Sequence, residues 1–159
     1  MIRFRPGARI IIAFLIVVSL GISVGLYATV QRPQRAERIL FFPGTVEPDL
    51  SGEARLIPRR DELEGRVALL VEELTYGPAR IDRSRVVPRQ TRPESVMVRN
   101  GTAYIDLSTQ VLAEDTSVIL SLEESLNAIE HTVRYNFRQL DRIVITIGGE
   151  ILREQHPQS

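Results

Sequence analysis

Few side chains in this sequence are of a type that does covalent or metal chemistry. The chain has 159 residues and no cysteine, and all 20 of its basic residues are arginine. Disulfides, thiolate nucleophiles, thiolate metal sites and lysine Schiff bases are therefore excluded. The two histidines, His131 and His156, are too few for a multi-histidine metal site. The sequence predicts no catalytic residue, no metal site and no cofactor site.

Five carboxylates gather between residues 114 and 130. Paired carboxylates can hydrolyse glycosides where a cleft gives them contrasting environments. Apolar residues recur at the helical period through the same segment, so we expect these acids on a solvated helix face, and His131 also facing water. The five are Glu114, Asp115, Glu123, Glu124 and Glu130.

A segment rich in proline and arginine, residues 79–93, holds five arginines and one acid, Asp82. Such a run is either a solvated loop or a basic patch for anionic lipid, a cell-wall polymer or an acidic protein surface. No aromatic residue interleaves the arginines and the chain has a net charge of zero, which argues against nucleic-acid binding. The candidate partner-binding arginines are Arg80, Arg83, Arg85, Arg89 and Arg92.

Asp106 and Ser108 are two residues apart at the end of a predicted strand. Their side chains should point to the face opposite Ile105 and Leu107, because side chains alternate along a strand. They either cap the connection that follows the strand or form part of a partner or ligand site.

The N-terminal region predicts a membrane segment. Residues 10–30 are 21 residues without a charge, which as a helix would span about 31 Å. Three arginines precede them, so the positive-inside rule places the N-terminus in the cytoplasm and the remaining chain outside. The alternative is a signal peptide cleaved near Gly21 or Gly25. The expected segments are a basic cytoplasmic head (1–9), a transmembrane anchor (10–30), a stem (31–37), a folded domain (38–153) and a tail (154–159).

Gly21 and Gly25 are four residues apart within the apolar segment. This small-xxx-small spacing lets two membrane helices approach closely. It predicts a helix-helix contact in the membrane.

Two helices and several strands should position the candidate residues. We expect strands at 39–42 and 54–57, then a helix with Asp61 as N-cap and Glu64 in a capping box, ending at Gly77. Residues 79–93 show no core-forming period. Asn100-Gly101 predicts a two-residue hairpin turn that pairs Val98 with Ala103, Val96 with Ile105 and Met97 with Tyr104.

The last third of the chain predicts a second helix and a closing strand. The helix should be capped at residues 115–117 and run to about Phe137, with strands at 143–147 and 150–152 about a Gly148-Gly149 turn. The expected fold class is α+β, a two-layer sandwich in which two amphipathic helices cover one face of a mixed or antiparallel sheet.

In this order and spacing, the motifs from about residue 39 to residue 150 resemble the GerMN domain, the module of spore-germination GerM-type proteins. The most specific part is the hairpin from Val96 that ends in Asp106-Leu107-Ser108. The other parts are Leu40-Phe41-Phe42-Pro43 with Leu56-Ile57-Pro58-Arg59-Arg60, the leucine-rich helix that closes at Gly77-Pro78, and the strand Val144-Ile145-Thr146-Ile147-Gly148-Gly149-Glu150.

The resemblance implies an extracytoplasmic envelope module without enzyme activity. This chain carries one copy, where some members carry two, and lacks the lipid-anchoring cysteine that many have. The predicted function is a membrane-anchored, non-catalytic interaction domain of the cell envelope. Self-association would join the arginine-rich segment of residues 79–93, here called the connector, to the acidic segment of residues 114–130. The alternative is a cell-wall or carbohydrate-binding accessory of an envelope enzyme, which would use Asp106, Ser108 and the arginines.

Overall fold

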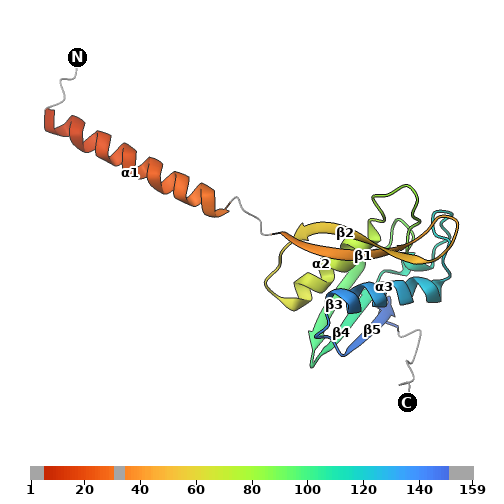
Figure 1. Cartoon of the computed structure of the whole chain (residues 1–159). Coiled ribbons are helices and arrows are strands. Elements are labelled where there is room, and N and C mark those ends of the chain that lie inside the picture. The colour runs from red at the N-terminus through yellow and green to blue at the C-terminus, as the bar shows by residue number, and fades with distance from the viewer. Residues whose placement is uncertain (1–5, 31–34, 151–159) are drawn as a thin grey trace. The chain divides into compact units, whose positions relative to one another are not determined.

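The structure is a computed structural model that describes residues 6–30 and 35–150. The chain divides into two compact units, Met1–Gln34 and Arg35–Ser159 (Figure 1). The predictions for residues 1–5, 31–34 and 151–159, which include the tail and most of the return strand, lie outside the described residues.

The first unit contains one helix, α1 (Pro6–Val30), whose side chains are described from Ile11 to Leu26. Its apolar side chains are exposed along this whole stretch, from Ile11 at 62% to Leu26 at 60%. Over the residues that the structure describes, no helix has the length and apolarity needed to cross a membrane.

The second unit has three layers, where the sequence predicted two. The prediction of an α+β fold is confirmed, but the strands form two sheets, β1-β2 and β3-β4-β5. The helices α2 and α3 lie between them, since α3 packs on β1 and α2 packs on β3 (Figure 1). The elements are β1 (Arg35–Pro43), β2 (Leu50–Pro58), α2 (Leu63–Thr75), β3 (Pro93–Arg99), β4 (Thr102–Leu107), the 3-10 helix η1 (Thr109–Leu112), α3 (Leu122–Asn136) and β5 (Arg142–Ile147).

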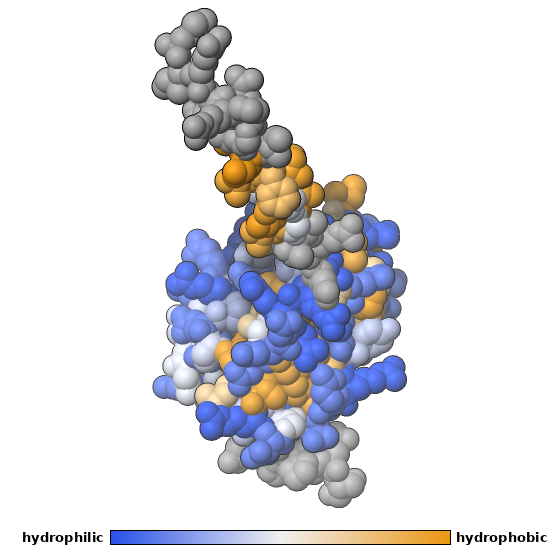
Figure 2. All heavy atoms as spheres, turned by 90° about the vertical axis from the view of Figure 1, so that its left-hand side faces the viewer, coloured by the Kyte–Doolittle hydropathy of each residue, from blue (hydrophilic) through white to orange (hydrophobic). Residues whose placement is uncertain are grey.

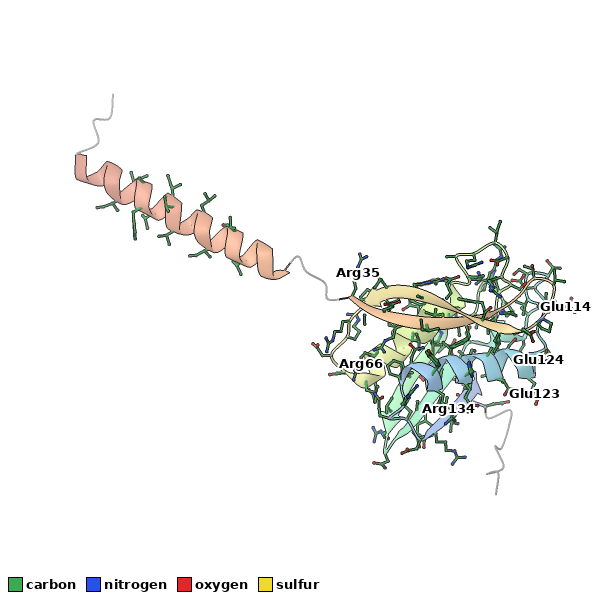
Figure 3. The ribbon with its side chains drawn as sticks, in the orientation of Figure 1. Arg35, Arg66, Glu114, Glu123, Glu124 and Arg134 are labelled. Atoms are coloured by element: carbon green, nitrogen blue, oxygen red, sulfur yellow. The ribbon has the colours of Figure 1, made fainter. Side chains whose placement is uncertain are left out.

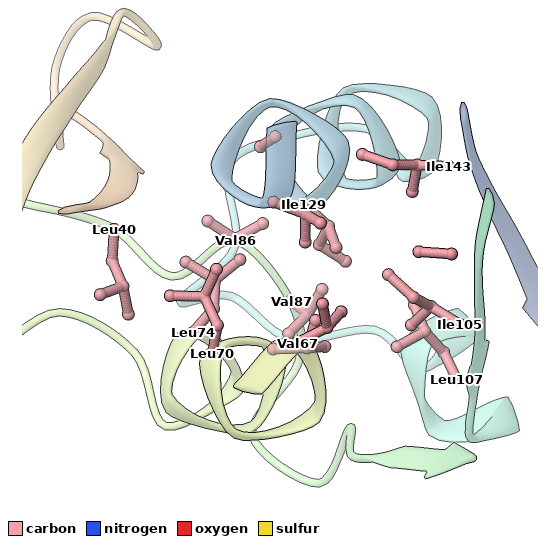
Figure 4. Packing of buried hydrophobic residues seen from close by; sticks show 14 of the residues in the cluster. Leu40, Val67, Leu70, Leu74, Val86, Val87, Ile105, Leu107, Ile129 and Ile143 are labelled. Atoms are coloured by element: carbon pink, nitrogen blue, oxygen red, sulfur yellow. The ribbon is translucent and has the colours of Figure 1, made fainter. Parts of the chain in front are cut away.

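The core joins all three layers (Figure 4). The sequence predicts that α2 is amphipathic, and its apolar stripe is buried, with Val67, Leu70, Val71 and Leu74 at most 1% exposed. Because helices between two sheets must pack on both sides, β1 and β4 both contribute side chains to this core. These are Leu40 and Phe42 from β1 and Ala103, Ile105 and Leu107 from β4.

The β3-β4 hairpin has the predicted register. Val98 pairs with Ala103, Val96 with Ile105 and Met97 with Tyr104. Asn100 and Gly101 have φ values of 49° and 75°, which the two-residue turn requires. The strand β5 pairs with β4 in parallel, so this sheet is mixed.

The start of α2 differs from the prediction. The helix begins at Leu63 after Glu62, which makes no side-chain capping hydrogen bond, so the predicted capping box of Asp61 and Glu64 is wrong. The Oε1 atom of Glu64 instead accepts a hydrogen bond of 2.9 Å from the backbone N–H of Val98. This contact joins α2 to the adjacent sheet. Glu64 therefore bonds a distant strand instead of the start of its own helix. The predicted end holds, because Gly77 has a φ of 90° after the last turn.

The second helix is also shorter than predicted. Its N-cap is Ser121, which forms a capping box with Glu124, and not a residue of the 115–117 segment. Asp115 instead closes a local turn, since its Oδ1 accepts hydrogen bonds from the Ser117 N–H at 2.9 Å and hydroxyl at 2.6 Å. A short polar side chain before an apolar run caps either a turn or a helix, which is why the prediction started too early.

The outer hairpin and the connector also depart from the sequence prediction. The strands β1 and β2 each begin four residues earlier than expected, at Arg35 and Leu50. In the segment predicted to lack core residues, Val86 and Val87 are buried at 0% and 1% exposure. The connector is therefore part of the core as well as of the surface.

Candidate functional site

A groove of about 490 Å³ separates the C-terminal half of α2 from the chain that leads into β3. Arg89 and Arg92 are exposed at this groove, and Tyr76 at the end of α2 is 63% exposed. The groove thus combines cationic and aromatic side chains, both of which are enriched in binding surfaces. The lining residues are Ala68, Glu72, Thr75, Tyr76, Arg89, Gln90, Thr91, Arg92, Pro93, Glu94, Ser95 and Val96.

Two polar features shape the groove. The Tyr76 hydroxyl donates a 2.8 Å hydrogen bond to Glu72, which together with the charge of that carboxylate raises the pKa of Tyr76. Thr91 is 4% exposed, and its hydroxyl has no hydrogen-bond partner among the described residues. Glu72 and Glu94 keep the charge of the groove mixed, which favours a partner with both acidic and basic groups.

Arg85, one of the five predicted arginines, acts within the fold. Its guanidinium donates to the carbonyl oxygens of Thr75 and of Tyr76, the latter at 2.7 Å, and to Val87 at 3.3 Å. The carbonyls of Thr75 and Tyr76 are at the C-terminal end of α2, where a cation is favourable. Burial lowers the pKa of Arg85, with Arg89 adding to the effect.

Arg80 and Arg83 lie in the first half of the connector. Arg80 pairs with Asp82 at 2.8 Å on the surface, and its hydrogen bonds lower the pKa of Asp82 to about 2. The backbone of Arg83 bridges to that of Gly44. Of the five arginines, the structure therefore brings only Arg89 and Arg92 together at a groove.

Asp106 and Ser108 connect elements of the fold. The Oδ1 atom of Asp106 accepts hydrogen bonds from the Thr146 hydroxyl at 2.6 Å and the Gly149 N–H at 2.9 Å, which fixes the turn after β5. Ser108 is fully buried, and its hydroxyl accepts from the N–H of Arg92 at 3.2 Å. Neither side chain caps the connection after β4 as predicted, because Ser108 precedes η1 without a side-chain capping hydrogen bond and Asp106 bonds β5 and the turn after it. A role of either residue in partner binding stays a prediction.

The acidic residues are divided between local bonds and the surface. Asp115 accepts from the Arg89 N–H at 3.0 Å, and Glu130 pairs with Arg134 at 2.7 Å. His131 is exposed, as predicted, with its ring centroid 4.4 Å from that of Phe41. In the part of the chain that the structure describes, no group of three or more histidine, aspartate or glutamate side chains could hold a metal ion.

Sequence reasoning missed a charged cluster that holds the start of the connector. Arg55 pairs with Glu53 and with Glu73, and it donates to the carbonyl of Gly77 at 3.1 Å. Glu53 in turn accepts from the N–H of Ala79 at 3.2 Å. The alternation of charges along β2 gives only a weak signal for it, because the partners are distant in the sequence.

Gly21 and Gly25 lie in α1. A Cβ added at either position meets no heavy atom of the described residues within 4 Å. The predicted contact between membrane helices stays a prediction.

Comparison with known proteins defines the class of this chain. A family model described as "Germane: Sporulation and spore germination" matches residues 39–153. The chain therefore belongs to this family, and the expected resemblance to GerMN domains is confirmed.

Individual relatives agree with that assignment. An "Uncharacterized lipoprotein" of Treponema pallidum (strain Nichols) is 32% identical over 96 residues, which cover 60% of this chain and 71% of the relative. The first GerMN domain of the sporulation protein GerM from Bacillus subtilis superposes with a TM-score of 0.60 at 17% identity, covering 78% of this chain and 91% of that one. The tandem GerMN domains of the same protein superpose with a TM-score of 0.57 at 18% identity, covering 79% of this chain and 44% of that one. At these identities the two structures define the fold.

Proposed function

We propose that this chain is a non-catalytic interaction domain of the cell envelope, placed outside the cytoplasm and held at the membrane by residues 10–30. The observation that carries the proposal is the groove between α2 and residues 89–96, where Arg89, Arg92 and Tyr76 are exposed. The partner that fits this surface is an envelope protein with acidic, basic and apolar side chains.

Family membership and a relative named as a lipoprotein support an extracytoplasmic location. The uncharged sequence of residues 10–30, its helical backbone in α1 and its exposed apolar side chains support the anchor. The basic residues before it support an N-terminus in the cytoplasm.

The topology is tested with reporters fused after residue 159. A reporter that is active only after export should be active, and a reporter that works only in the cytoplasm should be silent. The reverse result would overturn the location. A mature chain that starts within residues 22–29 would replace the anchor by a cleaved signal peptide.

The groove is tested by photocrosslinking in cells. A photoreactive amino acid at Gln90, which lines the groove, should trap one defined protein, and the same amino acid at the exposed Gln139 should not. Arg89→Glu with Arg92→Glu should abolish the product, because both cations at the groove change sign. Identical products from both positions would reject the groove as the binding surface.

The second candidate is a cell-wall or carbohydrate-binding accessory. Tyr76 and the polar side chains beside it could bind a glycan in the same groove, since aromatic rings stack on sugars and amides bond their hydroxyls. Sedimentation of residues 35–159 with purified cell wall distinguishes the two candidates. If residues 35–159 bind the cell wall and the Tyr76→Ala variant does not, the result favours the glycan-binding candidate.

Self-association through the connector and the acidic segment remains a second property to test. Glu114, Glu123 and Glu124 are exposed, but Asp115 already bonds the connector of its own molecule. Contacts between exposed charges are weak and sensitive to salt. Concentration-dependent sedimentation of residues 35–159 in low salt, lost in high salt, is the expected result, and a strict monomer would end the proposal.

A further inference from the structure

Five arginines gather at the end of the second unit where its chain begins. Arg35 is the first residue of β1, and Arg59 and Arg60 follow the last residue of β2, which pairs with Arg35. Arg38 lies on β1 and Arg66 in the first turns of α2. We call this group the arginine end.

Packing contributes to the arrangement of the arginine end. Among the described residues, the salt bridges involve none of Arg35, Arg38, Arg60 and Arg66. The Nε atom of Arg66 is buried without a hydrogen-bond partner in the same residues. Arg38 lies 5.0 Å from the ring centroid of Phe137, and its pKa is lowered by burial and then by the charges of Arg66 and Arg59. The neighbouring cations are therefore close enough to repel one another.

Exposed glutamates lie at the opposite end of the unit, beside connector arginines such as Arg89, whose N–H bonds Asp115. Figure 3 shows Arg35 and Arg66 at one end and Glu114, Glu123 and Glu124 at the other. Figure 2 looks onto the arginine end, which is covered mainly by hydrophilic residues. The arginine end also has four carboxylates, the exposed Glu37, Asp61 and Glu62 and the half-buried Glu64, so the five arginines exceed them by one positive charge.

The chain connects the arginine end directly to the apolar helix. Four residues, 31–34, separate the end of α1 from Arg35. Even fully extended, this link allows at most about 18 Å between Val30 and Arg35. If residues 10–30 are in a membrane, this short tether raises the local concentration of the arginine end near the lipid headgroups.

We propose that the arginine end binds the phosphate groups of anionic lipids, and so holds this end of the domain against the membrane. The placement near the membrane rests on the proposed anchor. The binding surface itself does not, because it belongs to the second unit alone. Arg35 and Arg60, which are exposed, make the contact, and the partly buried Arg38 and Arg66 contribute their charge from behind.

The experiment uses residues 35–159, which include every residue of the core cluster and so should fold without the anchor. Sedimentation with vesicles of phosphatidylglycerol and phosphatidylcholine should show binding that is absent with phosphatidylcholine alone and lost in high salt. Arg35→Gln with Arg60→Gln should weaken the binding about tenfold. The control, Arg89→Gln with Arg92→Gln, removes the same charge from the groove and should leave the affinity within about twofold.

Two results would overturn the proposal. No binding to the anionic vesicles would show that the arginine end has no affinity for lipid. Equal losses in the two double variants would mean that total charge, and not this surface, drives the association. Either failure leaves the anchor untouched, since the reporter fusions test it separately.

Discussion

The β3-β4 hairpin and the connector before it, residues 79–92, are adjacent in the sequence but depend on different forces. In the hairpin, two turn residues and the alternation of apolar side chains determine the structure locally. Its partners lie within a few residues of each other, as in Val98 with Ala103. A short window of sequence is enough to define it.

The connector has no such local pattern, and distant residues fix its path. Arg85 bonds the carbonyls at the end of α2, Glu53 bonds the N–H of Ala79, and Asp115 bonds the N–H of Arg89. Val86 and Val87 add apolar contacts to the core. A loop can therefore be as firmly placed as a hairpin when its polar backbone groups find tertiary partners.

The sharpest test of this contrast is Val86→Asp. Val86 is 0% exposed, and an unpaired carboxylate there should lower the free energy of unfolding by more than about 3 kcal/mol. Urea unfolding of residues 35–159, followed by circular dichroism, measures it. Ile81→Asp is the control in the same connector, because Ile81 is 99% exposed and should change stability by less than about 0.5 kcal/mol. Similar losses in both variants would contradict the buried position of Val86.

Arg85→Met should have the next largest effect. Methionine keeps the apolar stem but removes the charged donor from three carbonyls, which should lower the free energy of unfolding by about 2 kcal/mol. The control is Arg80→Met, whose arginine makes only a surface pair with Asp82 and should leave the urea midpoint nearly unchanged. Equal midpoints for the two variants would remove the capping role of Arg85.

On the hairpin side, Gly101→Val should destabilise the domain by about 1 kcal/mol or more. The φ of 75° at Gly101 is unfavourable for a β-branched residue, and a Cβ there would also displace the side chain of Asp141. Asn100→Gly should change the urea midpoint little, because glycine adopts the φ of 49° readily. A valine variant as stable as the parent would mean that the turn adjusts without strain.

The smallest expected effect concerns the pH dependence of the contact between Asp115 and the connector. Hydrogen bonds from the Ser117 hydroxyl, then from the N–H groups of Ser117 and Arg89, lower the pKa of Asp115 from 3.8 to about 2. The lowered pKa means that its stabilising contribution is present above about pH 4 and is lost as the pH falls to about 2. The difference in urea midpoint between the parent and Asp115→Asn should therefore shrink over this range. A difference in urea midpoint that is independent of pH would contradict a stabilising role of the ionised Asp115 carboxylate.

The same contrast explains what the sequence could predict. The hairpin register, the buried stripe of α2 and the exposure of His131 follow from local periodicity, and the structure confirms them. The arrangement of two sheets around the helices does not follow from it. The apolar side chains of Leu40 and Phe42 fit a core strand in a two-layer and in a three-layer arrangement. Only tertiary packing decides which side of the helices they cover.

The candidate site was predictable only in part. The sequence identified the five arginines as a group, but the role of each depends on where the connector returns to the fold. Arg85 reaches the end of α2, whereas Arg89 and Arg92 reach the groove. The prediction of capping residues failed for a related reason. Asp61, Asp115 and Ser121 are all short polar residues that precede apolar residues, and of these three only Ser121 caps a helix.

The parallel pairing of β4 with β5 has a consequence for the order of folding. The middle strand β4 can join β3 as soon as the hairpin is made, but it can join β5 only after α3 has crossed over between them. The sheet therefore cannot close before residue 147 is available, and such distant pairing is slow to form. If residues 10–30 hold the chain in the membrane with the N-terminus in the cytoplasm, as proposed, that delay leaves this sheet incomplete until almost all of the domain has crossed.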